Sequence, residues 1–123
     1  MPFRPLISVV DDDESVRESL PDLLKEFGFA VRAFSSPEEF LASNCVDLTK
    51  CLILDIAMQR MTGPDLQREL TRRRQMIPII FITADIDATT RLRLLEMGAV
   101  DCLFKPFSDT ALREALNAAL QLN

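Results

Sequence analysis

The stretch Cys51-Leu52-Ile53-Leu54-Asp55-Ile56-Ala57-Met58 decides how the rest of the sequence is interpreted. A mostly apolar run leads into Asp55, and a helix-starting signal, Thr62-Gly63-Pro64-Asp65, follows within ten residues. A short apolar run bounded by polar residues is typical of a buried strand in a parallel sheet. Asp55 is therefore expected at the carboxyl edge of the sheet, where open α/β folds bind ligands. Such an acid can also be a plain helix cap, so its assignment depends on the other strand ends.

Length and composition indicate one soluble domain spanning residues 1–123. Hydrophobic residues make up 48% and charged residues 27% of the chain, an ordinary globular composition. The net charge of −5 argues against binding of this domain to nucleic acid or to an anionic membrane. No apolar stretch approaches the roughly 18 residues of a membrane span. With no secretory signal at the N-terminus, the sequence favours a cytoplasmic location.

Cysteine and histidine usage narrows the chemistry further. Cys45, Cys51 and Cys102 show no C-x-x-C spacing, so we expect reduced thiols buried in the core. The chain contains no histidine, which excludes histidine acid–base catalysis, histidine–metal sites and a role as a phosphohistidine carrier.

Apolar runs alternate with helical patterns along the whole chain. The predicted strands are Leu6–Val10, Phe29–Phe34, the run ending at Asp55, Pro78–Ile82 and Val100–Phe104. The predicted helices run from about Val16 to Phe27, Pro37 to Ala42, Pro64 to Arg74, Ala88 to Met97, and from the Ser108 cap to about Leu122. Asn44–Lys50 reads as a polar connection, and Pro21 is expected to bend the first helix without ending it.

This alternation predicts a doubly wound α/β fold with helices on both faces of a parallel sheet. The commonest solution with five strands is the flavodoxin-like (βα)5 arrangement with strand order 2-1-3-4-5. Its chain reverses direction between strands 1 and 3, which is where a ligand site is expected.

Polar residues follow four of the predicted strands. Asp11 and Asp12 follow the first, Asp55 ends the third, Thr83 follows the fourth and Lys105 follows the fifth. These residues converge on one edge of a parallel sheet, and crowded carboxylates repel each other unless a cation lies among them. A small, hard, oxygen-liganded divalent ion fits such a set, so we expect Mg²⁺.

A carboxylate, Mg²⁺, an ammonium group and a hydroxyl together form a site that can receive a phosphoryl group. In phosphoryl transfer the protein mainly positions the reactants and stabilises charge on the equatorial oxygens. Aspartyl phosphate is a known covalent intermediate, so Asp55 is the candidate nucleophile.

Four motifs now resemble one family: Val9-Val10-Asp11-Asp12-Asp13, Leu54-Asp55-Ile56-Ala57-Met58, Ile82-Thr83-Ala84 and Lys105-Pro106-Phe107. In this order at matching strand ends they are similar to the receiver domain of two-component response regulators, the CheY-like superfamily. The stretches Ser15–Leu20, Met61–Leu66 and Gly98–Asp101 are most similar to its FixJ-like branch. Members of that branch often carry a C-terminal DNA-binding helix-turn-helix.

The resemblance implies a role for each site residue. Asp55 is then the phosphoacceptor, and it binds Mg²⁺ directly together with Asp12 and the backbone carbonyl of Ala57. Asp11 contacts the metal through water. The domain is not an enzyme in the ordinary sense, because it catalyses only its own phosphorylation and dephosphorylation.

The resemblance also assigns the residues around the phosphoryl group. Thr83 and Lys105 hold its oxygens, and the Lys105–Pro106 peptide is expected to be cis. Ala57 and Asp85 flank the approach of the water that hydrolyses the aspartyl phosphate.

The partners implied by the family are a histidine kinase or phosphotransfer protein and an output for transcription regulation. That output is either a C-terminal DNA-binding domain or a separate effector, controlled through the surface formed by helix 4, strand 5 and helix 5. Homodimerisation on phosphorylation stays open, as does the choice between a stand-alone receiver and one domain of a longer regulator.

The sequence departs from the family at three positions. Gln59 stands where a proline usually follows the methionine, Pro21 is unusual in the first helix, and Cys102 occupies the position of a switch Phe or Tyr. A cysteine has far less volume than an aromatic ring, which places the usual rotamer signal in doubt.

Two other classes of protein are the alternatives. A phosphohydrolase of the haloacid-dehalogenase type needs a second acid where this chain has Ala57, and a flavodoxin-type binder needs a small-residue loop where this chain has acids. The remaining alternative is a pseudo-receiver, an interaction module that is never phosphorylated.

Overall fold

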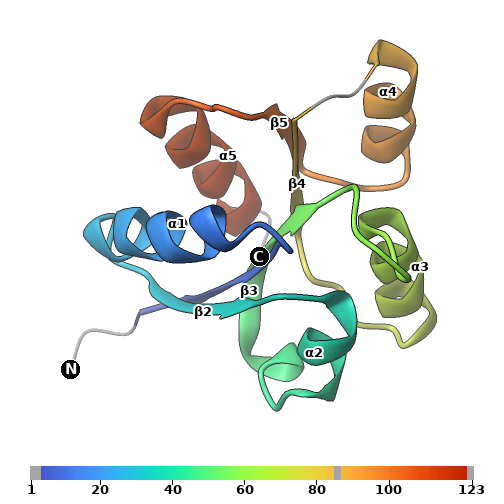
Figure 1. Ribbon diagram of the computed structural model, residues 1–123, viewed down its shortest axis with the longest axis horizontal. Helices are drawn as coiled ribbons and strands as arrows, with labels where there is room; N and C mark the ends of the chain where they lie inside the picture. Colours follow the sequence, from blue (N-terminus) through green and yellow to red (C-terminus); the bar gives the residue numbers. More distant parts are fainter. Residues whose placement is uncertain (1–3, 85–86, 122–123) are drawn as a thin grey trace.

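A computed structural model describes residues 4–84 and 87–121. The strands are β1 (Leu6–Val10), β2 (Ala30–Phe34), β3 (Thr49–Asp55), β4 (Ile79–Thr83) and β5 (Asp101–Phe104). The helices are α1 (Glu14–Glu26), α2 (Pro37–Ala42), α3 (Gly63–Arg72), α4 (Ala88–Glu96) and α5 (Asp109–Gln121), with a 3₁₀ turn, η1, at Val46–Leu48. All strands pair in parallel in the order β2-β1-β3-β4-β5, which confirms the predicted doubly wound fold (Figure 1).

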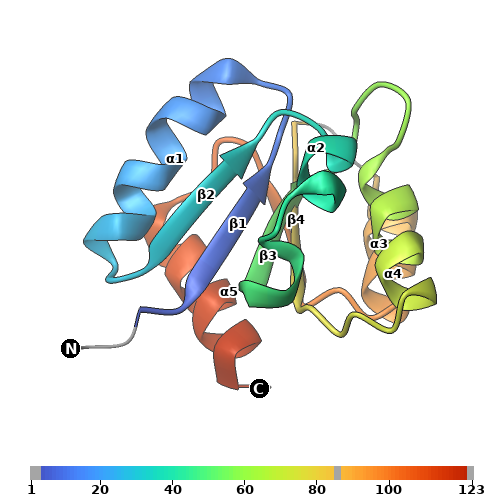
Figure 2. The same ribbon diagram turned by 90° about the horizontal axis from the view of Figure 1, so that it is seen from below.

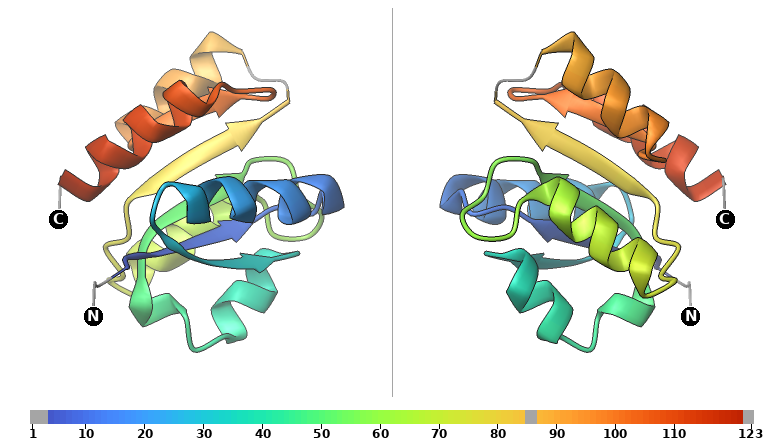
Figure 3. Two further views of the ribbon diagram at one scale, coloured as in Figure 1. Left: turned by 90° about the vertical axis from the view of Figure 1, so that its left-hand side faces the viewer. Right: turned by 90° about the vertical axis from the view of Figure 1, so that its right-hand side faces the viewer.

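Helices cover both faces of this sheet. Helices α1 and α5 lie on one face, and α2, α3 and α4 lie on the other (Figures 1 and 3). The alternation of side chains along β3 explains the two layers, because Leu52 and Leu54 belong to one buried cluster while Cys51 and Ile53 belong to the other. A strand that is apolar on both faces is therefore the centre of the fold, as its continuous apolar run predicted.

The start of β3 differs from the prediction. The strand begins at Thr49 instead of Cys51, and η1 occupies part of the expected polar connection. Thr49 is buried because its hydroxyl bonds both the hydroxyl of Ser8 and the carbonyl of Cys45, each at 2.7 Å. The strand was predicted from its apolar run, which does not include Thr49. Thr49 can lie in the buried strand because its hydroxyl bonds to Ser8 and Cys45 outside it.

The other boundaries coincide with the prediction or differ by one or two residues, the usual uncertainty at element ends. Helix α1 is continuous through Pro21, as expected. The cap of the last helix is also confirmed, because the backbone N–H of Ala111 donates to the hydroxyl of Ser108 at 3.0 Å. The predicted helix end at Leu122 lies outside the described residues.

Two further expectations concern the described part of the chain. All three cysteines are free thiols and are buried, as predicted. Within residues 4–84 and 87–121, no helix combines the length and apolar character needed to cross a membrane.

Candidate functional site

The carboxyl ends of the strands point to the same side of the molecule (Figure 2). Asp11 and Asp12 follow β1, and Asp55 is the last residue of its neighbour β3. One carboxylate oxygen from each of these three residues lies within 4.8 Å of the others. We call Asp11, Asp12 and Asp55 the acid cluster. Parallel pairing of adjacent strands brings the cluster together, because it aligns the two strand ends.

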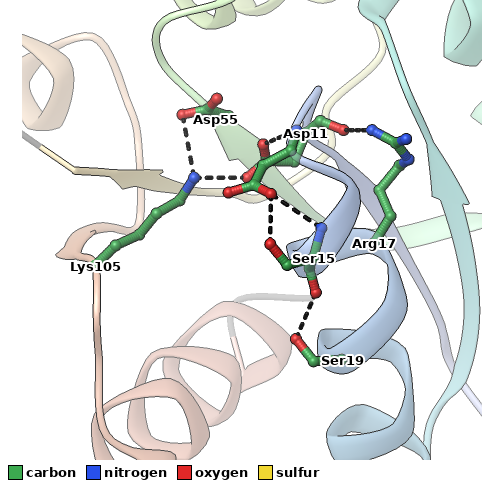
Figure 4. Close-up of polar contacts among 7 residues, drawn as sticks. Asp11, Ser15, Arg17, Ser19, Asp55 and Lys105 are labelled. Carbon is green, nitrogen blue, oxygen red and sulfur yellow. Dashed lines mark hydrogen bonds and ion pairs between the residues drawn. The ribbon is translucent and has the colours of Figure 1, made fainter.

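Asp11 is the buried anchor of the cluster, and each of its polar groups has a partner (Figure 4). Its N–H donates to the carbonyl of Phe34 at 3.1 Å, and its carbonyl accepts from Arg17 Nη1 at 2.9 Å. Its carboxylate accepts from the N–H of Asp13 and from Lys105 Nζ, both at 2.9 Å. Asp11 therefore connects β2, α1 and the segment after β5 at a single residue.

Lys105 is the cation of the site and lies between two carboxylates (Figure 4). Its Nζ is 2.9 Å from Asp11 Oδ2 and 3.8 Å from Asp55 Oδ1. Burial alone lowers the pKa of Lys105, but its hydrogen bond to Asp11 and the nearby carboxylates outweigh burial and raise the pKa. The ammonium group is therefore held in its charged form. The Lys105–Pro106 peptide is cis, as the family resemblance implied.

Asp55 is buried in an unfavourable electrostatic environment. Burial and the charge of Asp11 raise its pKa to about 6, with a smaller contribution from Asp12, and the attraction of Lys105 only partly opposes them. One lysine thus leaves the three carboxylates with uncompensated negative charge. A divalent cation would relieve this repulsion, and carboxylate oxygens are the ligands that Mg²⁺ prefers.

Thr83 ends the strand next to β3, and Ala57 follows Asp55 by two residues. Thr83 is the buried end of β4, and its carbonyl accepts the N–H of Lys105 at 2.7 Å. Ala57 is exposed in the loop after β3, next to Ile56, whose N–H donates to the carbonyl of Ile82 at 3.2 Å. Asp85, the other residue expected near the hydrolytic water, lies outside the described residues.

Gly63 is a site residue that the sequence interpretation missed. It is the first residue of α3, and its N–H donates to the carbonyl of Ile56, the residue after Asp55, at 3.0 Å. A Cβ at this position would lie 2.4 Å from the backbone oxygen of Asp55. Only glycine permits this approach. The sequence predicted a helix start at Gly63-Pro64 and a resemblance to the FixJ-like branch over Met61–Leu66, but no contact of Gly63 with Asp55.

The exposed side of the site is formed by Asp12. Its carboxylate borders a hollow of about 270 Å³ that is also lined by Ser35, Met58, Gln59 and Arg60. Gln59, where the family usually has proline, therefore lies at the rim of the site. Asp12 is thus the member of the acid cluster that is open to solvent.

The family model for the response regulator receiver domain matches residues 7–117, nearly the whole chain. The chain belongs to this receiver family. This membership confirms the resemblance inferred from the motifs at the four strand ends.

Relatives of the receiver domain have similar sequences and folds. Nodulation protein W of Bradyrhizobium diazoefficiens is 43% identical over 96% of this chain and 52% of its own length. The transcriptional regulatory protein FixJ of Rhizobium meliloti is 39% identical over 92% of this chain and 55% of its own length. The structure of the response regulator StyR superposes with a TM-score of 0.89 at 43% identity, over 98% of this chain and 61% of that one.

The receiver domain spans about half the length of the curated relatives it matches. It is a response regulator receiver domain of the kind found in two-component systems, and its relatives include a transcriptional regulatory protein.

Cys102, at the position of the family's switch aromatic, is buried in the layer beneath α4. It pairs with Phe81 across β4 and β5 and belongs to the same apolar cluster as Leu94 of α4. Burial raises the pKa of the Cys102 thiol, which keeps it protonated. The fully buried ring of Phe81 lies in the same apolar cluster.

Proposed function

We propose that this receiver domain accepts a phosphoryl group on Asp55 from a histidine kinase or a phosphotransfer protein, in a reaction that requires Mg²⁺. The observation that carries the proposal is the acid cluster at the carboxyl edge of the sheet, with Lys105 as its single described ion-pair partner. In the transfer, the bond from phosphorus to the donor histidine nitrogen breaks and a bond to a carboxylate oxygen of Asp55 forms. The donor must be external, since the chain contains no histidine.

The residues of the site suit separate parts of this reaction. Asp12, Asp55 and the backbone carbonyl of Ala57 would hold Mg²⁺ directly, with Asp11 acting through water. When bound, the ion supplies positive charge that offsets the cluster and the incoming phosphoryl oxygens. Lys105 would bind an oxygen of the phosphoryl group on Asp55, a role that its distance of 3.8 Å from Asp55 supports, and the hydroxyl of Thr83 would bind another.

The output proposed for the phosphorylated domain is regulation of transcription through the surface of α4, β5 and α5. This surface holds a hollow of about 480 Å³ lined in part by Arg91, Phe104 and Phe107. Phe104 is 47% exposed, an unusual exposure for a phenylalanine that fits a surface used for contact. Homodimerisation on phosphorylation and control of a DNA-binding domain in a longer regulator are the outputs that this surface would serve.

Mass spectrometry after incubation with acetyl phosphate tests the phosphoacceptor. We expect the wild type to gain one phosphoryl group in the presence of Mg²⁺ and none in excess chelator. Hydroxylamine should remove the group, because it cleaves acyl phosphates and leaves phosphoesters intact. The Asp55→Asn variant should not be labelled.

The matched control is Asp22→Asn, which removes an exposed carboxylate of α1 and should be labelled like the wild type. Labelling of Asp55→Asn at the wild-type rate would show that another residue is the acceptor. A wild type that takes no label from acetyl phosphate or from a kinase would instead support the pseudo-receiver alternative.

A further inference from the structure

Arg17 makes an unexpected contact beside the acid cluster. It lies in the first turn of α1, where its N–H donates to the carbonyl of Asp13 at 3.2 Å. Its guanidinium donates to the backbone carbonyl of Asp11 at 2.9 Å (Figure 4). No ion pair of Arg17 occurs among those found in residues 4–84 and 87–121, although several carboxylates are close in sequence.

The carbonyl that Arg17 binds belongs to the peptide group that joins Asp11 to Asp12. A peptide group is planar, so the direction of its carbonyl also sets the position of the next nitrogen and Cα. Fixing this plane therefore fixes the position of the Asp12 Cα, so that only rotations within Asp12 itself are left to orient its side chain. On the other side of the plane, Asp11 is already held by its N–H and by both carboxylate oxygens.

Helix capping does not explain the contact. The N-cap of α1 is Asp13, whose carboxylate accepts from the N–H of Ser15 at 2.9 Å and from its hydroxyl at 2.7 Å. Arg17 takes no part in these bonds. Its guanidinium instead acts on the one backbone segment that connects the buried and the exposed member of the acid cluster.

We propose that Arg17 is a positioning residue, which directs the Asp12 carboxylate toward the metal position by holding the peptide group between Asp11 and Asp12. The inference rests on the proposed Mg²⁺ site. It adds a residue that acts on the metal through another side chain, as groups behind metal ligands commonly do.

Electrostatics and positioning predict opposite results when Arg17 is replaced. Removing a positive charge next to three carboxylates should tighten Mg²⁺ binding if charge is the main effect. Releasing the peptide group should weaken binding, because Asp12 must then be ordered when the metal binds. We expect the second effect to win, with a loss of roughly tenfold in affinity, the scale found for groups behind metal ligands.

Isothermal titration calorimetry with MgCl₂ measures this in Arg17→Met, Arg17→Lys and the wild type. We expect Arg17→Met to bind Mg²⁺ about tenfold more weakly than the wild type. Arg17→Lys should have an intermediate affinity, because the lysine ammonium group can donate to the carbonyl but lacks the rigid, planar guanidinium. Lys25→Met, at the far end of the same helix, removes an equal charge and should bind like the wild type. Melting curves in chelator, recorded by circular dichroism, separate a change in fold stability from a change in affinity.

The dependence on Asp12 gives a second, stricter test. If Arg17 acts through Asp12, then Arg17→Met should change the affinity little in an Asp12→Asn background. Equal or tighter Mg²⁺ binding by Arg17→Met, or a full tenfold loss in both backgrounds, overturns the positioning role. A wild type that binds no Mg²⁺ overturns both the metal site and the role of Arg17. If the wild type binds Mg²⁺ and Arg17→Met binds it equally well, only the role of Arg17 is overturned.

Discussion

The acid cluster and the carboxylates of α3 use the same chemical group in opposite ways. At the sheet edge, burial and the charge of Asp11 raise the pKa of Asp55 to about 6. On α3, hydrogen bonds from Arg72 and Arg73 lower the pKa of Glu69 to about 2. The pKa of Asp65, in the capping box with Thr62, is also lowered, by its hydrogen bonds to that residue. The α3 carboxylates are placed where ionisation stabilises the fold, whereas Asp55 is placed where burial and the charge of Asp11 oppose its ionisation.

This difference reverses the effect of pH on stability. A carboxylate whose pKa is lowered by folding contributes stability that is present above its ordinary pKa and lost as the pH falls. Asp55 has the raised pKa, so the folded state binds its proton more tightly than the unfolded chain does. In metal-free protein, its ionisation therefore removes stability as the pH rises from about 4 to about 6.

Gly63 is the first residue of α3 and lies against the backbone of Asp55, so it joins α3 to the acid cluster. Its substitution should have the largest effect on stability. A Cβ 2.4 Å from the backbone oxygen of Asp55 forces backbone to move. We expect Gly63→Ala to lower the free energy of unfolding by about 3 kcal/mol, the upper range for overpacking. Urea denaturation followed by circular dichroism measures the loss. Gly28→Ala is the control, because its Cβ meets nothing within 4 Å and costs only the strain of a φ of +99°, about 1 kcal/mol. Similar losses in the two variants would contradict the close approach at Gly63.

Removal of the charge of Asp55 should have the next largest effect. In metal-free protein at pH 7, we expect Asp55→Asn to raise the free energy of unfolding by about 1–3 kcal/mol, because it removes a charge that burial disfavours. Near pH 4 both proteins should be equally stable, since Asp55 is protonated in the folded wild type. Urea denaturation at a series of pH values tests this. A variant that is less stable than the wild type at pH 7 would show that the contact with Lys105 outweighs the repulsion.

The smallest effect is expected on α3. Glu69→Gln removes ion pairs to Arg72 and Arg73, whose nitrogens lie 2.5 and 2.6 Å from Glu69 Oε2. The two arginine side chains are exposed and Glu69 is partly exposed, so the loss in melting temperature should be small, should shrink further in high salt, and should decrease as the pH falls toward 2. Calorimetric melting at two salt concentrations measures it. A loss that persists in high salt would mean that Glu69 acts by something other than exposed charge.

The sequence was sufficient to predict the order of the strands and the residues at their ends. Apolar periodicity marks each βα unit, and a parallel sheet brings every carboxyl end to one edge, so Asp11, Asp55 and Lys105 could be placed together before any coordinates. Caps such as Thr62 with Asp65 were also readable, because both partners lie within one turn.

Contacts that depend on the path of the backbone were decided only by the tertiary structure. Lys105 bonds the buried Asp11 at 2.9 Å and is farther from Asp55, at 3.8 Å, which no spacing in the sequence could reveal. Three other contacts are of the same kind: the burial of Thr49, the close approach of Gly63 to the backbone oxygen of Asp55, and the hydrogen bond from Arg17 to the carbonyl of Asp11. Each joins a backbone or hydroxyl oxygen to a distant or differently oriented segment. Residue type and periodicity carry no information on the direction of such an oxygen, which is set when the loops pack.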